Sequence, residues 1–129
     1  MVYVVDTHSF VWFLEDNPRL GAQAKTILSD PSARLVIPTI VLAEIVFLYA
    51  RKRIGVDVQS VLSHVARSVN CVIYPLDQTV VEFLPTELDI HDAIIVATAK
   101  VFRDVLGEEV RIITKNAQIA ASGLIPIVW

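Results

Sequence analysis

Short runs of apolar, mostly β-branched residues alternate along this chain with longer stretches of helical periodicity. The runs cover Val2 to Val5, Arg34 to Ile37, Cys71 to Tyr74, Arg111 to Thr114 and Ile125 to Val128. Continuous apolar runs of this length are typical of strands that are buried on both faces in parallel sheets. The alternation predicts an α/β fold, with one three-layer α/β/α domain over residues 1–129 and a mostly parallel central sheet.

Helix signals fill the intervals between these runs. Thr7 is expected to cap the first helix, and Asp89 is expected to precede a long one that ends before Gly107. The cations Arg51, Lys52 and Arg53 are expected in the last turn of another helix, where they favour the helix dipole. The predicted helices cover residues 9–15, 22–28, 39–53, 57–68, 77–84, 90–106 and 116–122.

The composition excludes several classes of protein. With 54% hydrophobic and 19% charged residues, the chain is too apolar to be disordered. Its longest apolar stretch is interrupted by Pro38, Thr39 and Glu44, so no membrane span is predicted. The lone Cys71 excludes an internal disulfide and suits the reducing cytoplasm. The formal net charge of −3 argues at first against a nucleic-acid partner.

Glu44 does not fit its surroundings. On a helix, its neighbours on the same face are Ile40, Val41, Phe47 and Leu48, all of them apolar. A carboxylate is rarely buried in such a stripe without a partner. Either a salt bridge to a basic residue or a role as a metal ligand or catalytic acid would explain it.

Three further polar residues stand at the edges of predicted strands and helices. Asp6 and Asn116 follow strands, and Asp92 lies in the first turn of a helix. Taken singly, each has a structural explanation, because Asp and Asn are good helix caps and an acid in the first turn favours the helix dipole. At the third helical position after a cap at Asp89, Asp92 could also close a capping box.

Taken together, the acidic residues indicate a site. A parallel α/β fold starts the helices that carry Glu44 and Asp92 at the sheet edge where Asp6 and Asn116 follow their strands. Three carboxylates in one place repel each other unless a cation neutralises them. Oxygen ligands select a hard ion, Mg²⁺ or Mn²⁺, of the kind used in phosphodiester chemistry. Such an ion would also offset part of the negative charge, so the net charge of −3 does not exclude a nucleic-acid partner.

Four segments carry a resemblance to a known family. They are VVDTHSFVWFL, IPTIVLAEIVFL, LDIHDAIIVATA and IITKNAQIA, and their order and spacing extend over nearly the whole chain. In these segments the chain resembles the PIN-domain family, specifically the VapC-type toxin ribonucleases of type II toxin–antitoxin systems. The resemblance implies a metal-dependent endoribonuclease that hydrolyses RNA phosphodiester bonds, without a His or Ser nucleophile.

Site residues carry over by position. By resemblance, Asp6 and Asp92 hold the metal directly, and Glu44 ligates it or orients its bound water. The last motif departs from the family, because Asn116 stands where an aspartate is usual. An asparagine keeps an oxygen ligand but removes one negative charge, so Asn116 is the weakest ligand assigned and a second metal is expected to bind less well.

Basic and polar residues near these motifs are candidate substrate contacts. Thr114 and Lys115 adjoin Asn116, and Arg51 and Lys52 are candidates for RNA phosphates, with a solvated helix end as the structural explanation. His8 and His91 adjoin the predicted acids and are weaker candidates. No spacing of histidines and cysteines indicates zinc.

Two other functions stay open. One is a PIN-like module that binds RNA or protein but cleaves weakly or not at all, as the change at Asn116 suggests. The other is a phosphoacceptor or phosphatase domain with Asp6 as nucleophile and Lys115 as phosphate partner, although Asp6 lacks the acidic neighbour that such domains need. By resemblance, the partners are an RNA substrate and a cognate antitoxin, and the chain is expected to form a homodimer.

Overall fold

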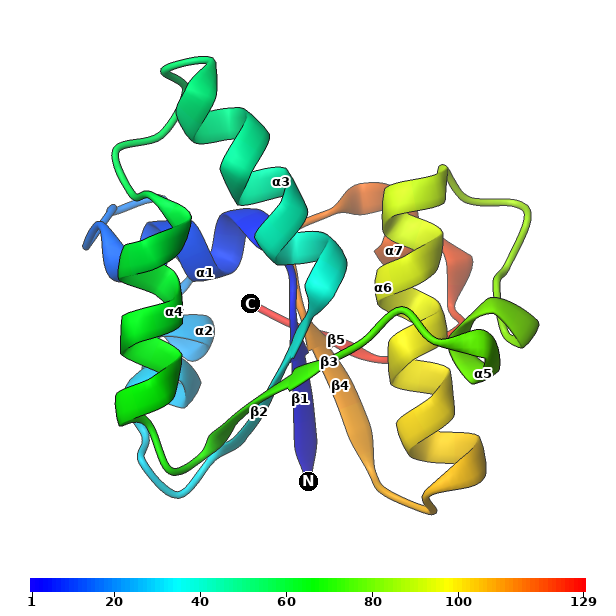
Figure 1. Ribbon diagram of the computed structural model, residues 1–129. Coiled ribbons are helices and arrows are strands. Elements are labelled where there is room, and N and C mark those ends of the chain that lie inside the picture. Colours follow the sequence, from blue (N-terminus) through cyan, green and yellow to red (C-terminus); the bar gives the residue numbers. More distant parts are fainter.

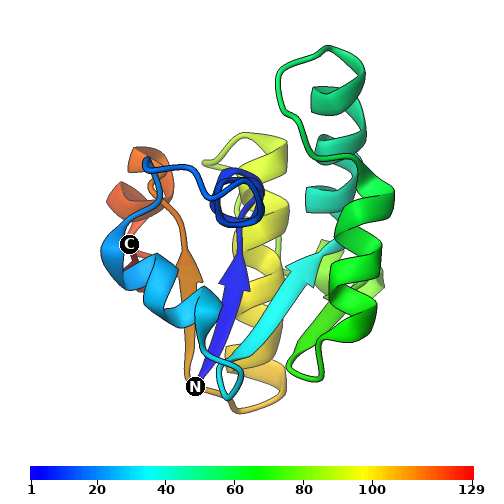
Figure 2. The same cartoon turned by 90° about the vertical axis from the view of Figure 1, so that its left-hand side faces the viewer.

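The computed structural model describes all residues, 1–129, and its strands form one parallel sheet. The strand order is β3-β2-β1-β4-β5, and every neighbouring pair is parallel. The arrowheads of β1, β2 and β4 point the same way in Figure 2. The α/β prediction is therefore confirmed. The strands are β1 (Val2–Val5), β2 (Arg34–Pro38), β3 (Cys71–Tyr74), β4 (Val110–Ile113) and β5 (Ile127–Val128).

Helices cover both faces of the sheet, as the three-layer prediction requires (Figure 1). The first face carries α1 (Thr7–Leu14), α2 (Ala22–Ser29), α3 (Thr39–Ala50) and α4 (Val58–Arg67). The opposite face carries α5 (Gln78–Glu82), α6 (Ile90–Lys100) and α7 (Ala117–Ser122). This division follows from right-handed crossovers, since the chain moves from β1 towards β3 and then returns past β1 to β4 and β5.

The strand order reverses between β1 and β4. In open parallel sheets, ligands bind outside the carboxyl ends of the strands at such a reversal. Asp6 follows β1, and Thr114 and Asn116 follow β4, so these residues lie at that point of the fold.

The core lies on both sides of the three central strands. Val4 of β1, Ile37 of β2 and Ile112 of β4 are fully buried, as is Phe10 of α1. Phe47 and Tyr49 of α3 lie outside the core, and their exposed fractions in the single chain are 58% and 47%. The far half of α3 extends above the sheet in Figure 1, which leaves its apolar residues without cover from the core.

Two helices end earlier than predicted. The helix predicted over 39–53 ends at Ala50, because Lys52 adopts a positive φ of 59° that stops it, so the cations follow the last turn. The helix predicted over 90–106 is α-helical only to Lys100, and a π-helical turn, Val101–Val105, follows it before Gly107. None of the helices combines the length and the apolar character needed to cross a bilayer.

The cap predicted for the first helix is also corrected. Asp6, not Thr7, is the N-cap of α1, because its carboxylate accepts a hydrogen bond from the backbone N–H of Ser9 at 2.9 Å. Thr7 becomes the first helical residue, which frees its hydroxyl for another partner. Asp89 caps α6 through the N–H of His91, as expected.

Candidate functional site

Asp6 is held between the ends of β1 and β4. One carboxylate oxygen caps α1, and the other accepts a short hydrogen bond from the hydroxyl of Thr114. Ser9 adds a second link between the two segments, because its hydroxyl donates to the carbonyl of Ile113 at 3.0 Å. Both Ser9 and Thr114 are fully buried. The carboxylate of Asp6 therefore has a single orientation.

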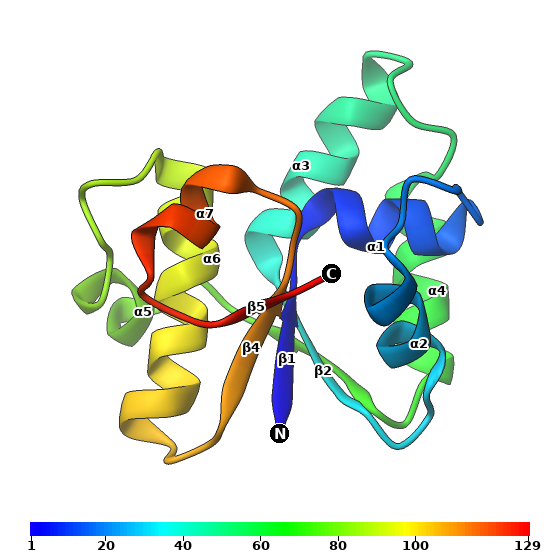
Figure 3. The same ribbon diagram turned by 180° about the vertical axis from the view of Figure 1, so that it is seen from behind.

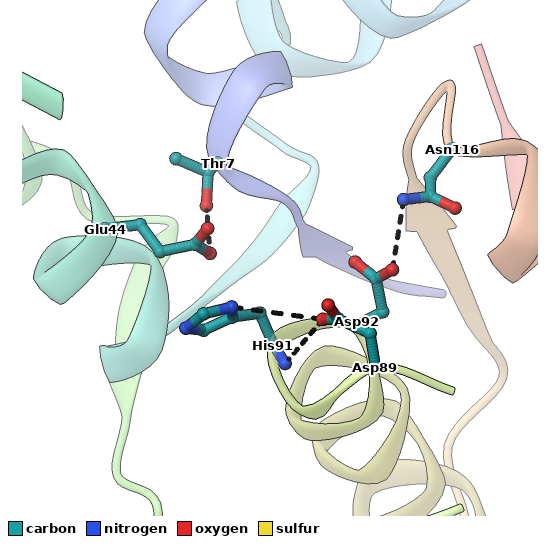
Figure 4. Close-up of polar contacts among 6 residues, drawn as sticks. All are labelled: Thr7, Glu44, Asp89, His91, Asp92 and Asn116. Carbon is teal, nitrogen blue, oxygen red and sulfur yellow. Dashed lines mark hydrogen bonds and ion pairs between the residues drawn. The ribbon is translucent and has the colours of Figure 1, made fainter. Parts of the chain in front are cut away.

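Asn116 connects this end of β4 to α6. Its amide nitrogen donates to a carboxylate oxygen of Asp92 at 3.3 Å, as Figure 4 shows. Its amide oxygen accepts from the N–H groups of Gln118 and Ile119 and so caps α7. The capping explanation for Asn116 is thus confirmed, and it is the NH₂ group of this side chain that faces Asp92.

Glu44 of α3 is paired with a neutral group. The hydroxyl of Thr7 donates to its carboxylate at 2.8 Å (Figure 4). None of the ion pairs of the structure includes Glu44, so the salt bridge, one of the two explanations considered for Glu44, does not form. Phe47, next to it on α3, is exposed, so the apolar stripe around Glu44 is partly a surface.

The acids are not gathered into one cluster. No group of three or more His, Cys, Asp or Glu side chains is placed to hold a metal ion together. Asp6 and Asp92 are linked through Thr114 and Asn116, whereas Glu44 lines a separate pocket with Phe47. The expected grouping of three carboxylates is therefore not formed in this structure, and each carboxylate is anchored by a neutral donor: Thr114 for Asp6, Asn116 for Asp92 and Thr7 for Glu44.

The environment of Asp92 raises the pKa of its carboxyl group. Burial is the main cause, and the carboxylates of Asp89 and Asp6 add to it by repulsion. The hydrogen bond from Asn116 and the proximity of His91 lower the same pKa. No lysine or arginine forms an ion pair with Asp6 or Asp92. The carboxylates of Asp6 and Asp92 are therefore not neutralised by a basic side chain.

This raised pKa has a measurable effect on the metal-free protein. The folded state holds the proton of Asp92 more tightly than the unfolded chain does. The resulting stabilisation is complete below the unfolded pKa, at about 3.9, and is lost as the pH rises through the folded pKa. Asp92→Asn should therefore gain stability relative to the wild type as the pH rises.

Denaturant unfolding in EDTA, between about pH 3.5 and 7, measures this difference. Asp16→Asn is the control, because Asp16 is 90% exposed at its side chain and lies away from the site. A difference between Asp92→Asn and the wild type that does not change with pH would contradict the prediction.

The basic residues near the acids face aromatic rings. The ammonium group of Lys115 lies 5.9 Å from the centroid of the Trp12 ring, and the guanidinium group of Arg51 lies 5.3 Å from that of Phe47. Lys115 lines a pocket that includes Asp6, whereas Arg51 and His91 line the pocket of Glu44. Lys52 lines neither pocket.

Sequence reasoning missed Thr7 and Ser9. Their hydroxyls donate hydrogen bonds to Glu44 and to Ile113, which are distant in the sequence. No local sequence pattern reveals such pairs. The sequence DTHS does place two hydroxyl residues in the first turn after the strand-end acid, and this is the one signal that could have indicated them.

Comparison with protein families decides the identity of the domain. A family model described as "PIN domain" matches residues 3–121. The chain belongs to the PIN-domain family. The match leaves the phosphoacceptor alternative without support. No curated protein matches the chain.

Solved structures share the fold of this PIN domain at low identity. VapBC2 from Rickettsia felis, bound to a promoter DNA fragment, is 17% identical with a TM-score of 0.64, and 99% of this chain and 98% of that chain are covered. A toxin–antitoxin complex from Klebsiella pneumoniae is 23% identical with a TM-score of 0.65, over 98% and 96%. VapBC-1 from nontypeable Haemophilus influenzae is 15% identical with a TM-score of 0.63, over 99% and 97%.

The residues of this PIN domain fit a hard divalent cation. The carboxylates of Asp6 and Asp92 have no cationic partner, and repulsion between them contributes to the raised pKa of Asp92. A divalent cation between them would relieve that repulsion. The available oxygen atoms belong to carboxylate and hydroxyl groups, which suit Mg²⁺ or Mn²⁺ better than zinc.

Proposed function

We propose that this PIN domain is a Mg²⁺- or Mn²⁺-dependent endoribonuclease and the toxin of a VapBC-type toxin–antitoxin pair. The observation that carries the proposal is the hydrogen-bonded series Asp6–Thr114–Asn116–Asp92. It places two carboxylates without cationic partners at the reversal point of the sheet. The likeness to VapBC and toxin–antitoxin structures supports the same function.

In this proposal, each residue has a defined task. Asp6 and Asp92 would hold the metal ion, and Glu44, fixed by Thr7, orients the attacking water. When bound, the ion lowers the pKa of that water and polarises the phosphate. Thr114 holds the orientation of Asp6, and the amide of Asn116 holds Asp92. The oxygen of Asn116 already caps α7 and is the weakest candidate ligand.

An RNA-cleavage assay tests the proposal. Purified protein is incubated with single-stranded RNA in Mg²⁺, in Mn²⁺ and in EDTA, beside Asp6→Asn protein prepared in the same way. Cleavage that requires the cation and Asp6 supports the proposal. Equal cleavage by the two proteins would mean that a contaminating nuclease is responsible, and it would contradict the proposal. Binding of RNA without cleavage would instead favour the inactive module that the change at Asn116 suggests.

Divalent cations are expected to raise the midpoint of thermal unfolding. A ligand that binds only the folded state stabilises it by about 2.7 kcal/mol at 100 times its Kd. The wild type should therefore unfold at a higher temperature in Mn²⁺ than in EDTA, and Asp92→Asn should show a much smaller rise. Equal rises in both proteins would mean that the cation binds elsewhere.

The exposed apolar residues of α3 support the proposed protein partners, an antitoxin and a second copy of the chain. Val46, Phe47 and Tyr49 are all about half exposed, which is unusual for residues of this size. We expect the isolated chain to be a dimer in small-angle scattering. A monodisperse monomer at micromolar concentration would contradict this expectation.

A further inference from the structure

A second pocket opens beside Asp6 and Asn116, and Glu44 is not among its lining residues. Its volume is about 290 Å³, and its walls include His8, Trp12 and Trp129. Asp6 and Asn116 belong both to this pocket and to the hydrogen-bonded series described above. A group bound in this pocket would therefore lie next to whatever the carboxylates act on.

The aromatic wall of this pocket is assembled from the two ends of the chain. The rings of Trp12 and Trp129 pack edge to face with their centroids 6.0 Å apart, and the ring of His8 lies 5.6 Å from that of Trp12. Figure 3 shows the C-terminus lying beside α1. A side chain on Gly21 would meet Trp129, since a Cβ there would lie 2.5 Å from its atoms. The close packing against Gly21 fixes Trp129, and Trp129 in turn supports Trp12.

Lys115 is the cation that lines this pocket, and Arg19, which is outside the lining, also lies over the Trp12 ring at 5.7 Å from its centroid. The ammonium group of Lys115 lies over the ring of Trp12, and Lys115 is exposed and has no ion pair. An ammonium group held by a ring rather than by a carboxylate is free to exchange that contact for a phosphate. Aromatic surface with an adjacent cation is the combination that binds single-stranded nucleic acid.

We propose that this pocket is a nucleotide subsite, in which an unpaired base of the RNA stacks on the Trp12–Trp129 wall and Lys115 takes the neighbouring phosphate. The inference rests on the proposed function, since it gives the RNA its place relative to Asp6. It also divides the surface by chemistry. The pocket with the tryptophans and Lys115 takes a base and its phosphate, whereas the pocket that Glu44 lines along α3 has more apolar walls and no tryptophan.

The sequence offers a direct reporter, because Trp12 and Trp129 are the only two tryptophans of the chain. Tryptophan emission therefore reports on this pocket alone. A single-stranded RNA of about eight nucleotides, within the usual size of such sites, is titrated in EDTA so that cleavage does not interfere. N-acetyltryptophanamide corrects for absorption by the RNA. Labelled RNA, followed by anisotropy, measures binding independently of the tryptophans.

The wild type is expected to lose emission as RNA binds, with the same midpoint as the anisotropy. Trp12→Ala should weaken binding roughly 10-fold or more, and Trp12→Phe should retain most of it. Lys115→Gln should weaken binding and reduce the salt slope by about 0.7. Lys25→Gln, at an exposed lysine away from the pocket, is the matched control and should bind like the wild type.

The outcomes separate this inference from the proposed function. RNA that binds by anisotropy without changing the emission, and with equal affinity for Lys115→Gln and the wild type, overturns the subsite even if cleavage is intact. Emission loss that depends on Lys115, in a protein that does not cleave RNA, supports the subsite and overturns the nuclease. No binding by either measurement overturns the subsite. Trp12→Phe and Lys115→Gln keep the test decisive if Trp12→Ala does not fold.

Discussion

Replacing either Asp6 or Asp92 by asparagine is expected to reduce RNA cleavage by at least about 100-fold. Each substitution keeps the shape of the side chain and removes one negative charge from the carboxylate pair. Asp6→Asn also replaces one acceptor oxygen with an NH₂ group, so it cannot accept both from Ser9 and from Thr114. Initial rates of cleavage in saturating Mn²⁺, with a single-stranded substrate, measure both losses.

Asp16→Asn makes the same chemical change outside the site. Asp16 lies just beyond α1 with a φ of 53°, a conformation that asparagine tolerates. The Asp16→Asn protein should therefore cleave RNA at the wild-type rate. Thermal unfolding of all the proteins separates lost chemistry from lost folding. If the folded Asp6→Asn and Asp92→Asn proteins cleaved RNA at the wild-type rate, neither residue would be needed for catalysis.

Phe10→Ala is expected to destabilise the fold by about 3–5 kcal/mol, the usual cost of removing a buried phenylalanine ring. Phe10 is fully buried in α1, the helix that Asp6 caps, and its ring packs edge-on against the imidazole of His64. The cavity would lie under the helix that positions Asp6 and Thr7. Denaturant unfolding measures the loss, which is a large part of the total stability of a domain of this size.

Phe47→Ala makes the identical change on an exposed residue. With 58% of Phe47 exposed, the effect on the unfolding free energy should stay within about 0.5 kcal/mol. If the face of α3 joins two copies of the chain, Phe47→Ala should instead weaken the dimer, which scattering detects. Equal losses in Phe10→Ala and Phe47→Ala would mean that the face of α3 is buried in the folded protein.

The fold was predictable because burial leaves a pattern that is local in sequence. The runs at 2–5 and 34–37 form the covered strands β1 and β2, whereas the equally apolar run at 71–74 forms the edge strand β3, where Val72 is half exposed. Helix ends were less predictable. Lys52 stops α3 by adopting a positive φ, which no composition rule requires of a lysine, and nothing in the sequence explains the π-helical turn at 101–105.

The sequence predicted which residues belong to the candidate site, but it did not predict which side chains contact one another. Asp6, Asp92 and Asn116 were expected at one sheet edge because parallel strands share their carboxyl ends, and the structure joins them there. The pairing of Glu44 with Thr7 was not predicted, since the two residues are 37 positions apart. The Trp12–Trp129 wall joins still more distant positions, and only the fold brings them together.

The link between Asp6 and Thr114 has a consequence for synthesis. The two residues are 108 positions apart, so the partner of the first acid is translated well after the acid itself. A ribosome adds about 5–20 residues per second, and the early part of the chain emerges first. Until β4 has left the exit tunnel and docked against β1, Asp6 lacks Thr114, and Asp92 lacks Asn116. A chain that has not yet extended through β4 therefore carries the acids without their arrangement, and the proposed nuclease site is complete only after β4 has docked.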